Sequence, residues 1–148
     1  MVWKPHVTVA AIIERDGEFL LVEEETDDGL RFNQPAGHLE CGETLSAAIV
    51  REVLEETGHA FMPRSLVGIY HWHNAARDIT YVRFTFAGEV VSHDATRQLD
   101  VGIVAARWVP LAQIQAMPER LRSPMVMRGI DDYLAGKRFP LDLIADMS

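Results

Sequence analysis

The pattern of residues 44–57, TLSAAIVREVLEET, constrains the fold more than any other part of the chain. Its apolar residues recur at the three- and four-residue spacing of an amphipathic helix, with Thr44 as the N-cap and Gly58 as the residue that ends it. Apolar, β-branched runs lie on both sides of this segment. A helix between two blocks of strands predicts an α/β domain in which the helix packs its apolar face on a sheet.

Five apolar runs rich in valine, isoleucine and phenylalanine are typical of strands. They span residues 6–14, 19–25, 65–73, 79–91 and 104–110. Asp16-Gly17 between the first two predicts a hairpin turn, and a shorter extended piece should end at Pro35. Two further helices are predicted, one from Pro110 and one from Ser123-Pro124 that ends at Gly136. We therefore expect a mixed sheet with helices packed on it.

The 148 residues have the size and composition of one globular domain, 1–148, without repeats or linkers. The 22 acidic residues outnumber the 14 basic ones, and the net charge of −8 argues against a broad nucleic-acid-binding surface. No apolar run approaches the roughly 20 residues that span a bilayer, residues 1–10 lack the features of a secretory signal, and Cys41 is the single cysteine. We expect a cytoplasmic monomer or homodimer that binds neither nucleic acid nor membrane.

Three glutamates gather on one side of the predicted helix: Glu52, Glu55 and Glu56. Like charges three and four residues apart repel one another, and these lie toward the negative end of the helix dipole. Two interpretations are open. The cluster is a solvated face with an Arg51–Glu55 ion pair, or it binds a divalent cation, because Mg²⁺ prefers hard oxygen ligands. A bound cation would also allow an acidic protein to accept a phosphorylated substrate.

The residues around this helix favour the metal site. Residues 37–59, which begin GHLECGETLSAAIVREVLEETG, resemble the Nudix box. This box is the loop-helix-loop signature of the Nudix hydrolases, and it is defined by glycines, glutamates and one arginine at fixed spacing. The matching positions are Gly37, Glu43, Arg51, Glu52, Glu55, Glu56 and Gly58. His59 departs from the pattern, which prefers an apolar residue there, and Ala60 or Phe61 can fill that packing role.

The resemblance extends over nearly the whole chain. The segments KPHVTVA, NQPAGHLE, RFTFA, RSP and FPLDLI are similar to one bacterial branch of the family. Members of that branch are phosphatases of nucleoside tri- and diphosphates and of the thiamine precursor hydroxymethylpyrimidine pyrophosphate. The resemblance implies an α/β/α sandwich, a small phosphorylated substrate, release of orthophosphate, and Mg²⁺ as cofactor with Mn²⁺ as a substitute.

Two alternatives stay open within the fold. The first is a pyrophosphohydrolase that acts on nucleoside triphosphates or ADP-ribose. Residues 74–76, Asn-Ala-Ala, stand where some family members carry a diagnostic proline or tyrosine, which disfavours ADP-ribose. The second is a non-catalytic nucleotide-binding protein, and such proteins usually lose box carboxylates that this chain retains.

The places of residues in the box imply their roles. Glu52 resembles the family's metal ligand or general base, and Glu55 and Glu56 resemble its metal ligands. A backbone carbonyl near Gly37 often completes the ligand set. Two further residues of the box would orient these groups: Glu43 and Arg51.

A further carboxylate from outside the box often joins the metal site of family members. Asp100 is the first candidate and Glu89 the second, and each can also be a plain surface carboxylate. His38 and Cys41 are too few for a zinc site, so we interpret them as loop residues. The acidic run 23–28, EEETDD, is interpreted as a solvated loop, with a second metal site as the alternative.

Three residues outside the box are candidates for contact with the substrate. Alternation in the run 79–91 places Arg83 opposite the apolar face of the strand, where it binds phosphate or forms a salt bridge. Trp72 lies on the other strand face from its two histidine neighbours, as a platform for a base or as a core residue. Gln34 hydrogen-bonds the substrate or satisfies its own loop.

Overall fold

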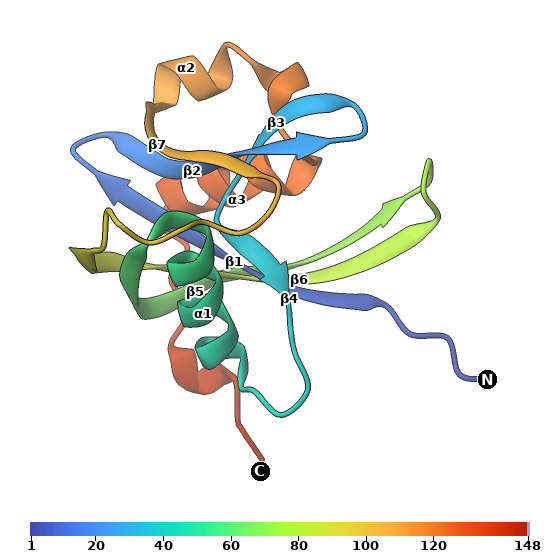
Figure 1. The fold of residues 1–148 in the computed structure, drawn as a ribbon. Coiled ribbons are helices and arrows are strands. Elements are labelled where there is room, and N and C mark those ends of the chain that lie inside the picture. The colour runs from blue at the N-terminus through green and yellow to red at the C-terminus, as the bar shows by residue number, and fades with distance from the viewer. Residues whose placement is uncertain (148) are drawn as a thin grey trace.

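The computed structural model describes residues 1–147, in which seven strands form one mixed sheet in two parts, with three α-helices packed against it (Figure 1). The strands are β1 (His6–Arg15), β2 (Glu18–Thr26), β3 (Gly29–Asn33), β4 (Ala36–His38), β5 (His59–Asn74), β6 (Ile79–His93) and β7 (Ile103–Pro110). The helices are α1 (Leu45–Thr57), α2 (Leu111–Gln115) and α3 (Pro124–Leu134), with short 3₁₀ turns η1 (Pro118–Arg120) and η2 (Leu141–Leu143).

Strand β1 connects the two parts of the sheet. It pairs in parallel with β6, which pairs in turn with β5, and on its other side it pairs antiparallel with β4. The predicted hairpin at Asp16-Gly17 is present, and both residues have positive φ. However, β1 and β2 pair only next to this turn, at Glu14 with Phe19 and at Arg15 with Glu18. Beyond it β2 leaves β1 and pairs with β3 and β7, which opens a space between the two parts.

Helices cover both faces of this arrangement. Ile49 and Val53 of α1 pack into one apolar cluster with residues of β1 and β6. Ile130 of α3 packs into a second cluster on the other side, together with Ile12. Because neighbouring residues of β1 enter opposite clusters, this strand forms the middle of an α/β/α sandwich, which confirms the predicted fold class.

The caps of the helices follow from local sequence. The Thr44 side chain accepts a hydrogen bond from Ala47 N at 3.1 Å, and Gly58 ends α1 in the left-handed region at φ 74°. Ser123 caps α3 in the same way, with Pro124 in the first turn. None of these helices is long and apolar enough to cross a membrane in the part of the chain that the structure describes.

Two predictions from the sequence are wrong in detail. The acidic run at residue 23 is not a solvated loop, because its first four residues belong to β2. Glu23 is buried and forms ion pairs with Arg107 and Arg120, so pairing with arginine keeps this charge inside the protein. The strand expected from residue 65 begins six residues earlier, at His59, directly after the end of α1.

Candidate active site

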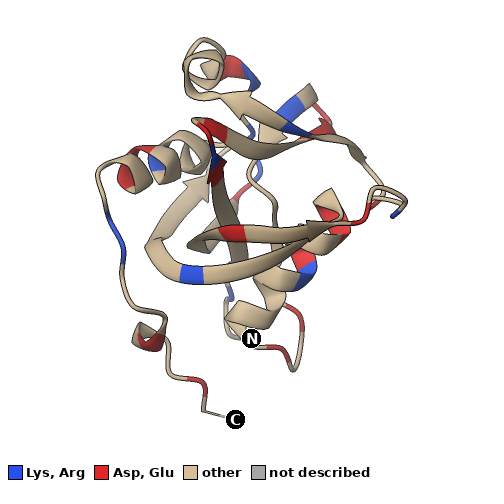
Figure 2. Ribbon diagram, turned by 90° about the vertical axis from the view of Figure 1, so that its left-hand side faces the viewer, with Lys and Arg blue, Asp and Glu red and all other residues tan. Residues whose placement is uncertain are grey.

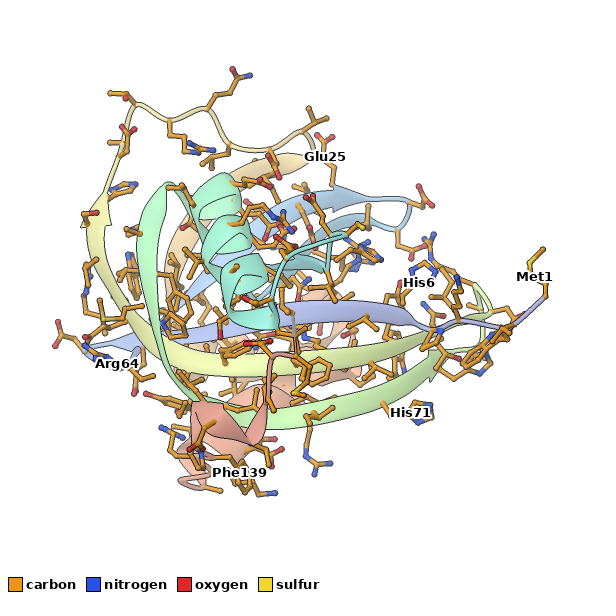
Figure 3. All side chains as sticks on the ribbon, turned by 90° about the horizontal axis from the view of Figure 1, so that it is seen from below. Met1, His6, Glu25, Arg64, His71 and Phe139 are labelled. Atoms are coloured by element: carbon orange, nitrogen blue, oxygen red, sulfur yellow. The ribbon has the colours of Figure 1, made fainter. Side chains whose placement is uncertain are left out.

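The carboxylates of α1 lie close to a further carboxylate, Asp100, from the loop before β7. Glu52, Glu55 and Asp100 each offer an oxygen, and the three oxygens lie within 4.8 Å of one another. The backbone holds Asp100 in place, since its N–H donates to the carbonyl of Glu55 at 3.0 Å. Glu89, the second candidate, instead forms an exposed ion pair with Arg64 of β5, which is labelled in Figure 3. The structure therefore brings Asp100, but not Glu89, to the cluster.

Arg51 connects the carboxylates to the loop before the helix. Its Nη1 donates to Glu52 at 2.8 Å and to Glu55 at 3.3 Å, while Nη2 donates to Glu43 at 2.7 Å. The same Nη2 donates to the carbonyl of His38 at 3.1 Å. The hydrogen bond from Arg51 lowers the pKa of Glu43. One guanidinium thus fixes three carboxylates in a common geometry, and the Arg51–Glu55 pair is only one of its contacts. Figure 2 shows the acidic and basic positions of the molecule on the ribbon.

Glu56 is buried, and its pKa departs far from the ordinary value of a glutamate. Its side chain is 8% exposed and accepts a hydrogen bond from Ala36 N at 2.8 Å. Burial raises the pKa of Glu56 to about 9, and the nearby charges of Glu52, Glu24 and Asp100 act in the same direction. Burial also raises the pKa of Glu52. This part of the protein therefore disfavours negative charge unless a cation compensates it.

Gly37 allows the backbone of β4 to approach the cluster closely. A Cβ atom at this position would lie 2.2 Å from Oε1 of Glu52, which is far inside van der Waals contact. The donors that surround this point are carboxylate and carbonyl oxygens, the ligands that Mg²⁺ and Mn²⁺ accept. These residues fit a divalent cation, and the solvated-face interpretation does not account for two buried, closely spaced glutamates.

A cavity of about 500 Å³ opens beside these carboxylates and reaches between the two parts of the sheet. Glu52, Glu56 and Gly37 line it together with Arg83 of β6. The Arg83 side chain is 4% exposed, and its Nη2 donates to Gln34 Oε1 at 2.5 Å and to Asn33 Oδ1 at 3.1 Å. Burial lowers the pKa of Arg83 to about 10, so the guanidinium stays charged at neutral pH.

Gln34 supports Arg83 from behind and does not line the cavity. It is 1% exposed, and its Nε2 donates to the carbonyl of Val126 in α3 at 2.9 Å. Both ends of the amide are therefore engaged within the protein. We therefore interpret Gln34 as a residue that connects Arg83 to α3 through its two hydrogen bonds, and not as a direct substrate contact.

Trp72 is not a core residue. Its ring is half-buried, lines the cavity and stacks on Tyr81 with ring centroids 5.7 Å apart and an angle of 14°. His71 and His73 are exposed on the other face of β5, as the alternation predicts, and Figure 3 shows His71 pointing away from the molecule. Tyr81 lies two residues from Arg83 on β6 and pairs with Trp72 of β5. The stacked pair is therefore displaced from Arg83 by two residues along the strands.

Two contributors to the cavity were not found from the sequence. Thr8 of β1 pairs with Arg83 and lines the cavity, and its buried Oγ1 has no hydrogen-bond partner among residues 1–147. Arg122 also lines the cavity and forms an ion pair with Glu24 at 2.9 Å. A threonine inside an otherwise apolar run was the available signal for Thr8, whereas the place of Arg122 depends on long-range packing.

His38 and Cys41 do not form a metal site in the described residues, and His38 is the last residue of β4 and not a loop residue as predicted. His38 Nε2 lies 2.9 Å from Nδ1 of His6, and Cys41 is exposed. Over residues 1–147, the cluster of Glu52, Glu55 and Asp100 is the one group with metal-ligand spacing.

Comparison with known proteins now identifies the family. The model of the family described as NUDIX domain matches residues 4–128. The chain belongs to the Nudix family. It is 42% identical over 147 residues to Phosphatase NudJ of Escherichia coli, covering 99% of this chain and 94% of that protein. It is 54% identical to a Nudix hydrolase from Nitrosomonas europaea, with a TM-score of 0.95 and coverage of 97% and 98% of the two chains.

More distant structures share the fold of this Nudix hydrolase. The Nudix domain of Shewanella oneidensis NrtR, solved with ADP-ribose, is 20% identical with a TM-score of 0.75, and the match covers 91% of this chain and 90% of that one. At this identity the likeness concerns the fold alone. The family model and the NudJ relative together make this protein an enzyme, a Nudix hydrolase, and Nudix hydrolases generally use divalent metal ions.

Proposed function

We propose that this Nudix hydrolase removes the terminal phosphate from nucleoside tri- and diphosphates, and from hydroxymethylpyrimidine pyrophosphate, with Mg²⁺ as cofactor and Mn²⁺ as a substitute. One observation carries the proposal. A single cavity joins the buried carboxylates of α1, the buried guanidinium of Arg83 and the stacked Trp72–Tyr81 pair. These three parts match a metal site, a phosphate contact and a platform for an aromatic ring. The phosphatase activity in the name of the E. coli relative supports release of orthophosphate.

The cation site would be built by the buried end of the Nudix box. The residues proposed to hold the ion are Glu52, Glu55, Glu56, the carbonyl near Gly37, and Asp100. When bound, the ion would supply positive charge for the phosphate oxygens and lower the pKa of the attacking water. Arg51 and Glu43 keep the carboxylates in position through the hydrogen bonds described above. Glu52, whose pKa burial raises, is proposed as a ligand or as the general base that accepts a proton from the water.

Arg83 is proposed to bind a phosphate oxygen of the substrate. Its Nη2 is engaged by two amides, while Nη1 makes no hydrogen bond to the described residues. The neighbouring Thr8 Oγ1 and the Nε of Arg83 are buried and unpaired within residues 1–147. Buried polar atoms without hydrogen-bond partners are unfavourable, so a polar ligand in this cavity would supply the partners that both side chains lack. Trp72 and Tyr81 would then contact the base or pyrimidine ring of the same substrate.

The bond that breaks can be tested with two nucleotides. GTP and GDP are incubated with the enzyme and Mg²⁺, without added pyrophosphatase, and the nucleotides are separated by chromatography. Early appearance of GDP from GTP, together with turnover of GDP itself, is the expected result. If GMP and pyrophosphate are the only first products, the enzyme attacks an inner phosphorus, and it is a pyrophosphohydrolase. If both nucleotides bind and neither is cleaved, the result favours the alternative of a non-catalytic nucleotide-binding protein.

The setting of the enzyme is also a proposal. We expect a monomer or homodimer in the cytoplasm, where an exposed thiol such as Cys41 remains reduced. Sedimentation of the purified protein at two concentrations would separate the two oligomeric states.

A further inference from the structure

A second cavity lies on the other side of the C-terminal end of α1, outside the proposed active site. Its volume is about 350 Å³, and its walls come from β1, β2, β5, β6, β7 and the last residue of α1, Thr57. Its basic and aromatic lining residues are Arg15, His59, His93 and Trp108. No aspartate or glutamate lines this cavity, although acidic residues outnumber basic ones in the chain as a whole. Its ionisable groups are therefore basic only.

His59 forms the inner wall of this cavity. It is the residue that departs from the Nudix box, where an apolar side chain is preferred, and it is 7% exposed. Its Nδ1 lies 3.1 Å from the carbonyl of Thr57, and its ring stacks on His93 with centroids 4.0 Å apart and an angle of 6°. Nε2 of His59 has no hydrogen-bond partner in residues 1–147. An imidazole in this place brings a polar nitrogen that packing alone does not require.

Arg15 provides a guanidinium at the rim. Its Cζ lies 4.6 Å from the centre of the Trp108 ring, and within the described part of the chain no carboxylate lies within ion-pair distance of it. Burial lowers the pKa of His59, and the charges of His93 and Arg15 act in the same direction, which shows that all three groups share one electrostatic environment. Asp94, the carboxylate next to His93, is fully exposed and is held by Thr96. The charge of His93 also lowers the pKa of Asp94, so Asp94 balances His93 in part, whereas Arg15 has no carboxylate partner in residues 1–147.

We propose that this cavity binds a phosphate group, either free or carried on a small molecule. A guanidinium fork and imidazole N–H groups are donors that match phosphate oxygens. The space exceeds that of a single ion, and Leu20, Ala106 and the exposed part of Trp108 offer apolar surface for an attached organic group. A transition metal does not fit, because two parallel imidazoles 4.0 Å apart cannot direct their nitrogens at one ion and Arg15 would repel it.

The experiment measures phosphate binding without metal. Inorganic phosphate is titrated into the wild-type protein in EDTA at about pH 6, and binding is followed by calorimetry and by NMR of the histidine rings. Binding of phosphate in the catalytic cavity is recognised by its dependence on Arg83, which also lines that cavity. We expect saturable binding that shifts the resonances of His59 and His93, at least tenfold weaker in Arg15→Gln and in His93→Gln. Both replaced side chains are exposed, so neither variant should lose its fold.

Two controls locate the ligand and identify its source. Arg83→Lys, which changes the catalytic cavity, should bind phosphate like the wild type. A nucleoside monophosphate titrated in the same way shows whether an organic group adds affinity: tighter binding indicates a phosphorylated small molecule, and equal binding indicates free phosphate. Absence of saturable binding, unchanged affinity in both variants of the second cavity, or loss of binding in Arg83→Lys would each overturn the proposal. These measurements do not depend on catalysis.

Discussion

Arg83 combines burial with a charge that has no carboxylate within ion-pair distance among residues 1–147. Two neutral amides, those of Gln34 and Asn33, accept its hydrogen bonds, so the charge is oriented but not neutralised. A buried cation of this kind is unfavourable for stability alone and suits a site that receives an anion. Gln34 sets the direction of the guanidinium, because its other end is held by the backbone of α3.

We predict that Arg83→Lys lowers kcat/KM about 10- to 100-fold without unfolding the protein. An ammonium cannot reproduce the planar fork, so it cannot contact both amides and a phosphate oxygen at once. Steady-state kinetics with the preferred nucleotide, together with thermal unfolding, checks this. Arg64→Lys is the matched control, since Arg64 pairs with Glu89 on an exposed surface. If Arg83→Lys behaves as Arg64→Lys does, Arg83 makes no fork-like contact with the substrate.

Some residues of the site were predictable from the sequence and others were not. The box fixed the places of Glu52 and Glu56 because their spacing is local to one helix. Asp100 was one of two candidates, and only the packing of its loop against α1 distinguishes it from Glu89. Trp72 kept two interpretations, since alternation tells which strand face a side chain occupies but not whether that face meets the core or a cavity. Gln34 also kept two, because its contact with α3 joins residues far apart in the sequence.

At the scale of elements, the site depends on the contact between α1 and the three-residue strand β4. The Ala36 N–H bonds Glu56, and Gly37 leaves room for the carboxylate of Glu52. The caps of α1 were predictable because they lie within a few residues of the helix. The division of β1 and β2 between two parts of the sheet was not, because their turn fixes only two residue pairs and the remaining partners lie far along the chain.

We predict that Gly37→Ala lowers kcat at least tenfold and weakens the apparent affinity for Mg²⁺. The added Cβ would lie 2.2 Å from Oε1 of Glu52, so the carboxylate must move away from its present place. The backbone of Gly37 does not have positive φ, so alanine introduces no strain of its own there. Activity as a function of Mg²⁺ concentration is the measurement. Wild-type kinetics in this variant would show that β4 and Glu52 need not approach each other closely for catalysis.

At the scale of the whole molecule, the carboxylate cluster links stability to pH and to metal. The pKa of Glu56 is about 9 in the folded protein, against an ordinary value of 4.5. Between these pH values the folded state holds a proton that the unfolded state has lost. The free energy of unfolding of the metal-free protein therefore falls as pH rises from about 4.5 to about 9. A cation bound to the ionised cluster opposes this loss.

We predict that Glu56→Gln makes the metal-free protein less sensitive to rising pH and lowers kcat at least 100-fold, on the order of 2.7 kcal/mol of transition-state stabilisation. Glutamine retains an acceptor for the Ala36 N–H but cannot ionise. Thermal unfolding in EDTA across this pH range, and kinetics at saturating Mg²⁺, test the two parts. A variant that unfolds with the wild-type pH dependence, or turns over at the wild-type rate, would contradict the corresponding part.

The parallel pairing of β1 with β6 has a consequence for biosynthesis. On one side, Val7 to Ile13 pair with Val82 to Gly88, on a segment that leaves the ribosome after α1, β4 and all of β5. The helix that carries the glutamates is thus made before the sheet against which it packs is complete. Contacts so distant in sequence close large loops and slow folding. During translation, the nascent chain must keep its first strand unpaired on that side until more than half of its residues have been made.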